Sequence, residues 1–169
     1  MVILATVDGE TTPDPVVRVG HEMAQAHEEP LVVLHVMPQE RFEERWDAIS
    51  QPGSAIASLA PGVQYGRDGK TGDRSGAEYS VEDGEAHAET VARAVIDETL
   101  DDDEDVSPLG RVGEVASEIV AEADRRDASY LVIGGRKRSP IGKTLFGSTT
   151  QSVLLGADRP VLTVMGNDE

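Results

Sequence analysis

The residues between positions 132 and 154 carry most of the features that could bind an anion. Gly134 follows an apolar run, and Gly147 and Ser148 precede a second apolar segment. Glycine lets an anion approach the backbone closely, and the first amides of a helix attract phosphate groups. The spacing therefore predicts a phosphate cradle with Gly134 at one end and Gly147 and Ser148 at the other.

A second interpretation of the same stretch is a nucleoside-triphosphate loop, because it contains the triplet Gly142-Lys143-Thr144. Such a loop requires another glycine five positions before Gly142, and that position holds Lys137. The short remainder of the chain also lacks an obvious later strand with a magnesium-binding aspartate. We therefore disfavour this second interpretation.

Ser148 also has a purely structural interpretation. The segment Ser148-Thr149-Thr150-Gln151 fits a capping box, in which Ser148 caps a helix and Gln151 reaches back to it. Helix–strand packing could likewise explain Gly147. Phosphate binding and helix capping are both consistent with these residues.

The elements that must position this stretch alternate between strands and helices. Short apolar runs predict buried strands, and apolar residues at helical spacing predict the helices between them. The order indicates an α/β protein with an open, parallel five-stranded sheet and helices on both faces. We expect strands at 2–7, 31–36, 106–112, 130–134 and 160–165, helices at 14–28, 85–100, 113–123 and 148–155, and a flexible Gly/Ser-rich insertion at about 50–85, all in a single domain of residues 1–169.

Two of the predicted strands end in residues suited to a ligand. One ends at Val7 and Asp8, and another ends at Ile133 and Gly134. Open α/β sheets bind ligands outside the carboxyl ends of their strands, so both pairs should lie at one edge. A carboxylate beside a glycine loop suits a nucleoside with phosphates.

Four segments resemble the universal stress protein family, the UspA-like domain. They are "ILATVDGE", "VVLHVMP", "GEVASEIV" and "VIGGRKRSPIGKTLFGSTTQSVLLGADRPVLTVM". The resemblance covers nearly the whole chain except about residues 45–85. It implies an adenine nucleotide alpha hydrolase-like, Rossmann-like fold and a role in the stress response.

The resemblance also implies a nucleotide site. Asp8 matches an acidic residue beside the adenosine of nucleotide-binding members, and Val36 matches a position whose backbone meets the adenine edge. The implied nucleotide-binding set is Val7, Asp8, Val36, Ile133, Gly134, Gly147, Ser148 and Thr149. Alternatively, Asp8 and Gly9 form only a turn, and Val36 belongs only to the core.

The chain departs from the family pattern at one position. ATP-binding members show Gly, two residues, Gly, nine residues and Gly-Ser/Thr, and the second glycine falls on Lys137. Lysine tolerates positive φ poorly and its side chain takes up space, which puts the usual phosphate geometry in doubt. Arg136, Arg138 and Lys143 add further positive charge nearby. These basic residues either bind an anion or form ion pairs with carboxylates of the protein.

The overall charge of the chain is strongly negative. It is -17, from 32 acidic and 15 basic residues, and only three of the bases are lysines. This balance predicts adaptation to a concentrated-salt cytoplasm, where a short Debye length screens carboxylate repulsion. It also argues against a nucleic-acid partner, which would require basic patches.

Composition and spacing favour few other functions. Cysteine is absent, and no apolar run is long enough for a membrane span. The start of the chain does not resemble a signal peptide, so we expect a cytoplasmic protein.

The acidic run 101–105 is interpreted as a solvated turn, because consecutive carboxylates converge poorly on one metal ion. The histidines (His21, His27, His35 and His87) lack metal-ligand spacing, His35 is interpreted as a satisfied core residue, and no catalytic motif is visible.

These observations lead to one functional hypothesis with two alternatives. We expect a cytoplasmic stress protein, not an enzyme, that binds ATP or another adenine nucleotide, with or without magnesium, as a regulatory ligand. The first alternative is a dimeric interaction protein of the same fold without a nucleotide, and a more distant one is a phosphotransferase or NTPase. The apolar last strand also predicts a homodimer that pairs through residues 160–166.

Overall fold

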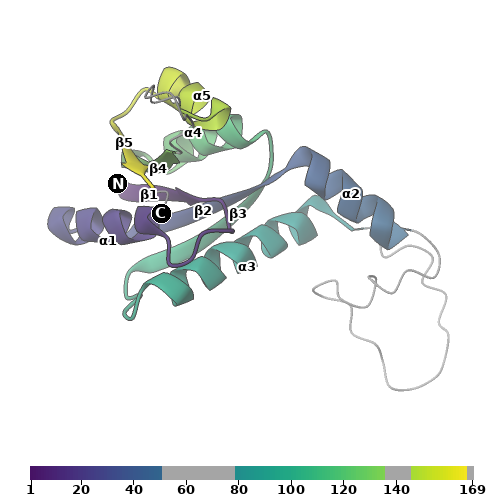
Figure 1. Ribbon diagram of the computed structural model, residues 1–169, viewed down its shortest axis with the longest axis horizontal. Helices are drawn as coiled ribbons and strands as arrows, with labels where there is room; N and C mark the ends of the chain where they lie inside the picture. The colour runs from purple at the N-terminus through teal and green to yellow at the C-terminus, as the bar shows by residue number, and fades with distance from the viewer. Residues whose placement is uncertain (51–78, 136–145, 167–169) are drawn as a thin grey trace.

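The computed structural model describes residues 1–50, 79–135 and 146–166 (Figure 1). Its five strands form one sheet in the order β3-β2-β1-β4-β5, and every neighbouring pair is parallel. The predicted α/β class with an open parallel sheet is therefore confirmed. The elements are β1 (Val2–Val7), α1 (Pro15–His27), β2 (Leu31–Pro38), α2 (Gln39–Ser50), α3 (Val81–Thr99), β3 (Val106–Gly113), α4 (Val115–Arg125), β4 (Ala128–Gly135), α5 (Ser148–Gly156) and β5 (Val161–Met165).

Two elements differ from the sequence-based expectation by more than two residues. Helix α2 follows β2 directly and was not predicted. Helix α3 begins at Val81, so the predicted end of the insertion at residue 85 is wrong. Ser80 accepts a hydrogen bond from the Asp83 amide, and Asp83 accepts one from the Ser80 amide, which fixes this start. The remainder of the predicted insertion, residues 51–78, lies outside the described residues.

The helices cover the two faces of the sheet in separate layers. Helices α1 and α3 pack on one face, and α4 and α5 pack on the other (Figure 1). The two apolar clusters meet only across the strands, where alternate residues such as Val33 and Leu34 belong to opposite clusters. Most residues of β2 are buried on both faces, as expected for a central parallel strand.

A smaller apolar cluster holds α2 against α3. Phe42 on α2 stacks near Tyr79, with ring centroids 5.4 Å apart. Gly84 on α3 lies beneath the Phe42 ring, and a Cβ at that position would come within 2.8 Å of it. The close approach of the two helices therefore depends on a residue without a side chain. None of the helices in the described segments has the length and apolarity needed to cross a membrane.

Candidate functional site

The candidate site is the carboxyl edge of the sheet between β1 and β4. Chain order reverses there, because β1 has β2 on one side and β4 on the other. The pairing of β1 with β4 ends at Ala5 and Val132, whereas the pairing of β1 with β2 continues to Val7 and His35. The ends of β1 and β4 therefore separate, and such a switch point is where open α/β sheets bind ligands.

The turn after β1 is built around Asp8. Its carboxylate accepts hydrogen bonds from the backbone amides of Glu10, at 2.8 Å, and Thr11, at 3.0 Å. Gly9 has φ of 79°, and a Cβ there would lie 2.5 Å from a methyl group of Val91. The interpretation of Asp8 and Gly9 as a turn is thus confirmed, while contact of Asp8 with a nucleoside stays a prediction.

His35 stabilises the end of β1 from the neighbouring strand. Its Nδ1 lies 3.1 Å from the carbonyl oxygen of Val7. A carbonyl can only accept, so Nδ1 is assigned as the protonated nitrogen of the neutral ring. Burial lowers the pKa of His35 below its usual value, against the opposing effect of its hydrogen bond to Val7. The prediction that His35 is satisfied by a hydrogen bond is confirmed, but the residue is partly buried rather than part of the core.

Asp14, which the sequence analysis missed, is a buried carboxylate at the same edge. Only 4% of the residue is exposed, and it caps α1 by accepting a 2.8 Å hydrogen bond from the Val16 amide. Its own amide donates to the Thr99 hydroxyl on α3 at 2.9 Å. Burial, together with the charge of Asp8, raises the pKa of Asp14 to about 6. An aspartate directly before a proline was the available signal, because this pair is common at helix starts.

Gly134 lies between the first turns of two helices. A Cβ at Gly134 would be 3.5 Å from Val16 of α1, on one face of the sheet. On the other face its carbonyl oxygen accepts a 2.9 Å hydrogen bond from the Thr150 hydroxyl of α5. Gly134 pairs with Val164 and is therefore part of β4 itself. The amino ends of α1 and α5 therefore both lie beside Gly134.

The start of α5 differs from the predicted capping box. Its N-cap is Gly147, with φ of -59° and ψ of 158°, and among the described residues no side chain bonds to the first amides. The capping-box interpretation of Ser148 is therefore wrong, since the backbone leaves the helix one residue earlier. Ser148 and Thr149 are both exposed, whereas Thr150 is buried and turned toward Gly134.

Other described helices at the two faces are capped by side chains. Asp14 caps α1, Ser80 caps α3 and Glu114 caps α4. Free amides and the positive end of the helix dipole attract an anion, and a capping carboxylate would compete for them. The amino end of α5 at Gly147 is therefore the better phosphate position at this edge.

The remaining predicted site residues have buried side chains. Val7, Val36 and Ile133 are 8%, 6% and 3% exposed, respectively, and all belong to the apolar clusters. The interpretation of Val36 as a core residue is confirmed, and its contact with an adenine edge stays a prediction. Gly135, missed in the sequence, follows at the strand end, where a Cβ would lie 2.5 Å from the sulfur of Met165.

Several predicted features lie outside the described residues. They include the position that departs from the family pattern, Lys137, and the neighbouring bases Arg136, Arg138 and Lys143. Within the part of the chain that the structure describes, no group of three or more histidine, aspartate or glutamate side chains could hold a metal ion.

A charge cluster on the α4 side is satisfied internally. Glu122 is 1% exposed and accepts hydrogen bonds from Arg111 at 3.0 Å and from Arg125 and Arg126 at 2.6 Å each. Burial raises the pKa of Glu122, but these three hydrogen bonds outweigh burial and hold the pKa below its usual value. The cluster ties α4 to β3 and is not a second anion site, because Glu118 and Glu85 also contact its arginines.

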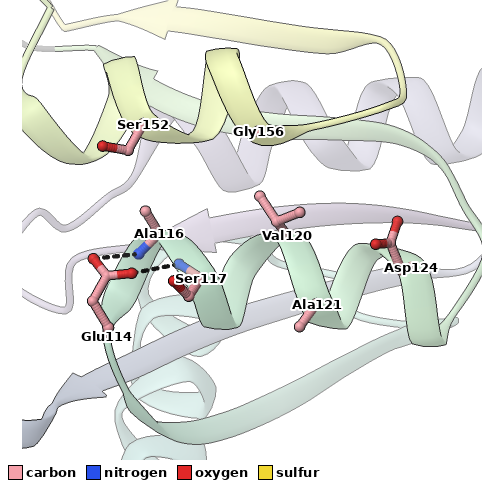
Figure 2. Close-up of a pocket in the computed structure, with 8 residues that line it drawn as sticks. All are labelled: Glu114, Ala116, Ser117, Val120, Ala121, Asp124, Ser152 and Gly156. Atoms are coloured by element: carbon pink, nitrogen blue, oxygen red, sulfur yellow. Dashed lines mark hydrogen bonds between the residues drawn. The ribbon is translucent and has the colours of Figure 1, made fainter.

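A shallow groove between α4 and α5 lies on the outer surface of that layer (Figure 2). The Glu114 carboxylate at one end bonds to the amides of Ala116 and Ser117, at 3.3 and 2.7 Å. This groove has a capped helix start and small side chains, so it suits a phosphate less well than the carboxyl edge does. It is lined by Glu114, Ala116, Ser117, Val120, Ala121, Asp124, Ser152 and Gly156.

The fold is that of an open parallel α/β protein. Its sheet has a switch point between β1 and β4, where such sheets bind ligands, and the start of α5 beside it can attract an anion. The family model for the universal stress protein family matches residues 64–165, more than half of the chain. The chain therefore belongs to the universal stress protein family, as its sequence resemblance predicted.

Individual relatives agree with this assignment. A universal stress protein from Mycolicibacterium smegmatis is 45% identical over 51 residues, which are 30% of this chain and 39% of that relative's length. The solved universal stress protein from Archaeoglobus fulgidus is 26% identical, with a TM-score of 0.52, over 96% of this chain and 97% of that one.

Two further solved structures share the fold at lower identity. The UspA protein from Lactobacillus plantarum is 19% identical, with a TM-score of 0.53, and the match covers 97% of each chain. A universal stress protein solved in complex with cAMP is 18% identical, with a TM-score of 0.52, over 99% of this chain and 98% of that one.

Proposed function

We propose that this protein binds an adenine nucleotide as a regulatory ligand at the carboxyl edge between β1 and β4. The observation that carries the proposal is the helix start at Gly147, which is capped by no side chain in the described part of the chain and lies beside a switch point of the sheet. A protein of the same fold and family is known in complex with cAMP. The proposal extends that ligand class to this chain.

The geometry suggests how the two halves of a nucleotide would lie. Phosphate oxygens would accept hydrogen bonds from the amides of the first turn of α5 and from the exposed hydroxyls of Ser148 and Thr149. The nucleoside would lie toward Asp8 and the backbone of Val36, at the ends of β1 and β2. Carboxylate oxygens accept more than one hydrogen bond each, so Asp8 can hold its turn and still accept a ribose hydroxyl.

We further propose that the nucleotide is bound without turnover in the cytoplasm. ATP with magnesium is one candidate and cAMP is another, and calorimetric titration with ATP, ADP, AMP and cAMP in molar KCl would rank them. Release of inorganic phosphate from ATP above background would instead support the NTPase alternative.

Replacing Gly147 by aspartate tests the phosphate position. No atom of residues 1–50, 79–135 or 146–166 lies within 4 Å of a Cβ built at Gly147, so the substitution fits the described fold. The new carboxylate would cap α5 and repel phosphate, and aspartate is a better N-cap than glycine. We expect Gly147→Asp to melt no lower than the parent, to lose cAMP binding and to retain adenosine binding.

Two further variants at this position complete the test. Gly147→Asn caps the helix without charge, so it should weaken cAMP binding less than aspartate does. Gly147→Val should abolish binding by filling the space that a phosphate would occupy. Unchanged affinity for cAMP in folded Gly147→Val and Gly147→Asp variants would exclude this placement.

We also propose a homodimer formed through β5. In the strand order β5 stands at the end of the sheet, paired to β4 alone among the described strands. Leu162 on this strand is 38% exposed, and Leu155 just before it is 81% exposed. An apolar edge strand is normally covered or paired, and two-fold pairing satisfies both copies at once.

The dimer has a direct test in solution. Thr163→Pro removes a backbone donor from β5 and should give monomers by light scattering at high salt. A mass near 18.0 kDa for the unmodified chain would exclude the dimer. If the dimer forms and no nucleotide binds, the alternative role as an interaction protein without a nucleotide gains support from this exposed edge.

A further inference from the structure

Two ionisable side chains, the buried Asp14 and the partly buried His35, lie on either side of the turn that follows β1. Asp14 approaches from the start of α1, where its carboxylate is fixed by the Val16 amide at 2.8 Å. His35 approaches from β2, where its ring is fixed by the Val7 carbonyl at 3.1 Å. The turn between them carries Asp8, whose charge acts on both groups.

Neither group is needed in its charged form by the contacts that hold it. Asp14 can cap α1 with one oxygen while the other carries a proton, and His35 can donate from Nδ1 whether its Nε2 is protonated or not. Each can therefore gain a proton without breaking its hydrogen bond. Each gain raises the local charge by one unit at the edge where an anion would bind.

We propose that binding of an anionic nucleotide at this edge is coupled to proton uptake by Asp14 and His35, so that the protein holds the nucleotide more tightly in acid. The inference rests on the proposed function and adds its regulation by pH. A ligand that favours one protonation state must shift the equilibrium between the two states by its difference in affinity.

The surrounding charges are consistent with this coupling. Asp14 is packed against α3 through the neutral Thr99 hydroxyl, and its charged neighbour is Asp8. His35 is acted on by Asp8 in the turn, by Arg41 on α2 and by His87 on α3. Arg41 also lies 3.7 Å from Glu10, and one further basic group, Arg45, acts on His87.

Both side chains gain a proton as the solution becomes more acidic. The pKa of Asp14 is raised to about 6, mainly by burial, so the carboxyl group gains its proton just below neutrality. Burial lowers the pKa of His35, so its ring is neutral at pH 7 and becomes charged in more acidic solution. Protonation of either group therefore raises the charge of the edge, at Asp14 just below neutrality and at His35 in more acidic solution.

The probe for this coupling is cAMP, with adenosine as its matched neutral control. A phosphate monoester such as AMP changes its own charge near pH 6, whereas the diester of cAMP keeps one charge across the range. If cAMP raises the pKa of Asp14 by one unit, its affinity increases by up to about tenfold from pH 8 to pH 5.5. Adenosine affinity should change much less, and calorimetry in buffers of different ionisation enthalpy should show proton uptake with cAMP.

Two variants assign the effect to the named side chains. Asp14→Asn keeps a capping oxygen, and His35→Asn keeps a donor near the position of Nδ1. Each should reduce the pH dependence of cAMP affinity, and the double variant should remove most of it. His27→Asn is the control, because this exposed histidine lies at the opposite end of α1 and should leave the dependence unchanged.

The outcomes separate the inference from the function beneath it. If cAMP binds equally well at pH 8 and pH 5.5 without proton uptake, the coupling is excluded and the nucleotide site stands. If the pH dependence survives in the folded double variant, other groups cause it and the assignment is wrong. If neither cAMP nor adenosine binds at either pH, the proposed function itself fails.

Discussion

Replacing Asp14 by asparagine should change how the stability of the protein depends on pH. The carboxylate is buried, and its pKa rises from the ordinary value of 3.8 to about 6 on folding. A group whose pKa is raised in the folded state stabilises the fold in acid, and this contribution disappears as pH rises through the folded pKa. Asparagine retains an oxygen for the Val16 amide but has no proton to lose.

The size of the effect follows from the shift. A difference of about two pKa units corresponds to about 3 kcal/mol in full, at 1.36 kcal/mol per unit. Because the unfolded carboxyl is still partly ionised at pH 4, about 2 kcal/mol of this falls between pH 8 and pH 4. The free energy of unfolding of Asp14→Asn minus that of the parent should therefore be about 2 kcal/mol larger at pH 8 than at pH 4, so the variant is relatively more stable at pH 8.

Urea unfolding of both proteins at fixed KCl concentration measures this double difference. The comparison cancels other titrating groups, including His35, whose lowered pKa acts in the opposite direction on stability. Asp97→Asn, on an exposed position of α3, is the control and should show little pH dependence relative to the parent. A constant difference between Asp14→Asn and the parent across the range would refute the argument that burial controls this carboxyl group.

Three further predictions concern the rest of the edge and the surface. Thr150→Val should cost about 1–3 kcal/mol by urea unfolding, because the Gly134 carbonyl loses its 2.9 Å donor; Thr150→Ser should restore most of that loss. Gly135→Ala should destabilise by about 1–3 kcal/mol, and Met165→Ala should partly rescue it, since the new Cβ meets the Met165 sulfur; no rescue would contradict this contact. The melting temperature should rise between 0.1 M and 2 M KCl, because a net charge of -17 repels itself when screening is weak; an unchanged value would argue against adaptation to salt.

The strands could be predicted from the sequence because burial in a parallel sheet leaves continuous apolar runs. β2 illustrates this, since its residues Leu31–Val36 are nearly all buried. Helix α2 was missed because its apolar stripe is short, with only Phe42, Trp46 and Ile49 at helical spacing in a charged segment. Its stripe packs on residues far along the chain, which local periodicity does not reveal.

The candidate site was predicted in outline but not in its detail. Asp8 and Gly134 were placed at one edge by general rules for parallel sheets. The cap of α5 could not be chosen, because Gly147 and Ser148 are both acceptable N-cap residues and the choice depends on where β4 and β5 direct the chain. The hydrogen bond from Thr150 to Gly134 and the burial of Asp14 likewise depend on tertiary packing.

The position of Gly134 has a consequence for how the two layers of the protein respond to substitution. The sheet separates the layers elsewhere, so changes in the α1–α3 layer and the α4–α5 layer should have additive effects on stability. At Gly134 one residue lies beside Val16 of one layer, where a Cβ would be 3.5 Å away, and accepts a hydrogen bond from Thr150 of the other. Substitutions at Val16 and Thr150 should therefore be energetically coupled, although the two residues lie on opposite faces of the sheet. The end of β4 is thus where a change in one layer affects the stability of the other.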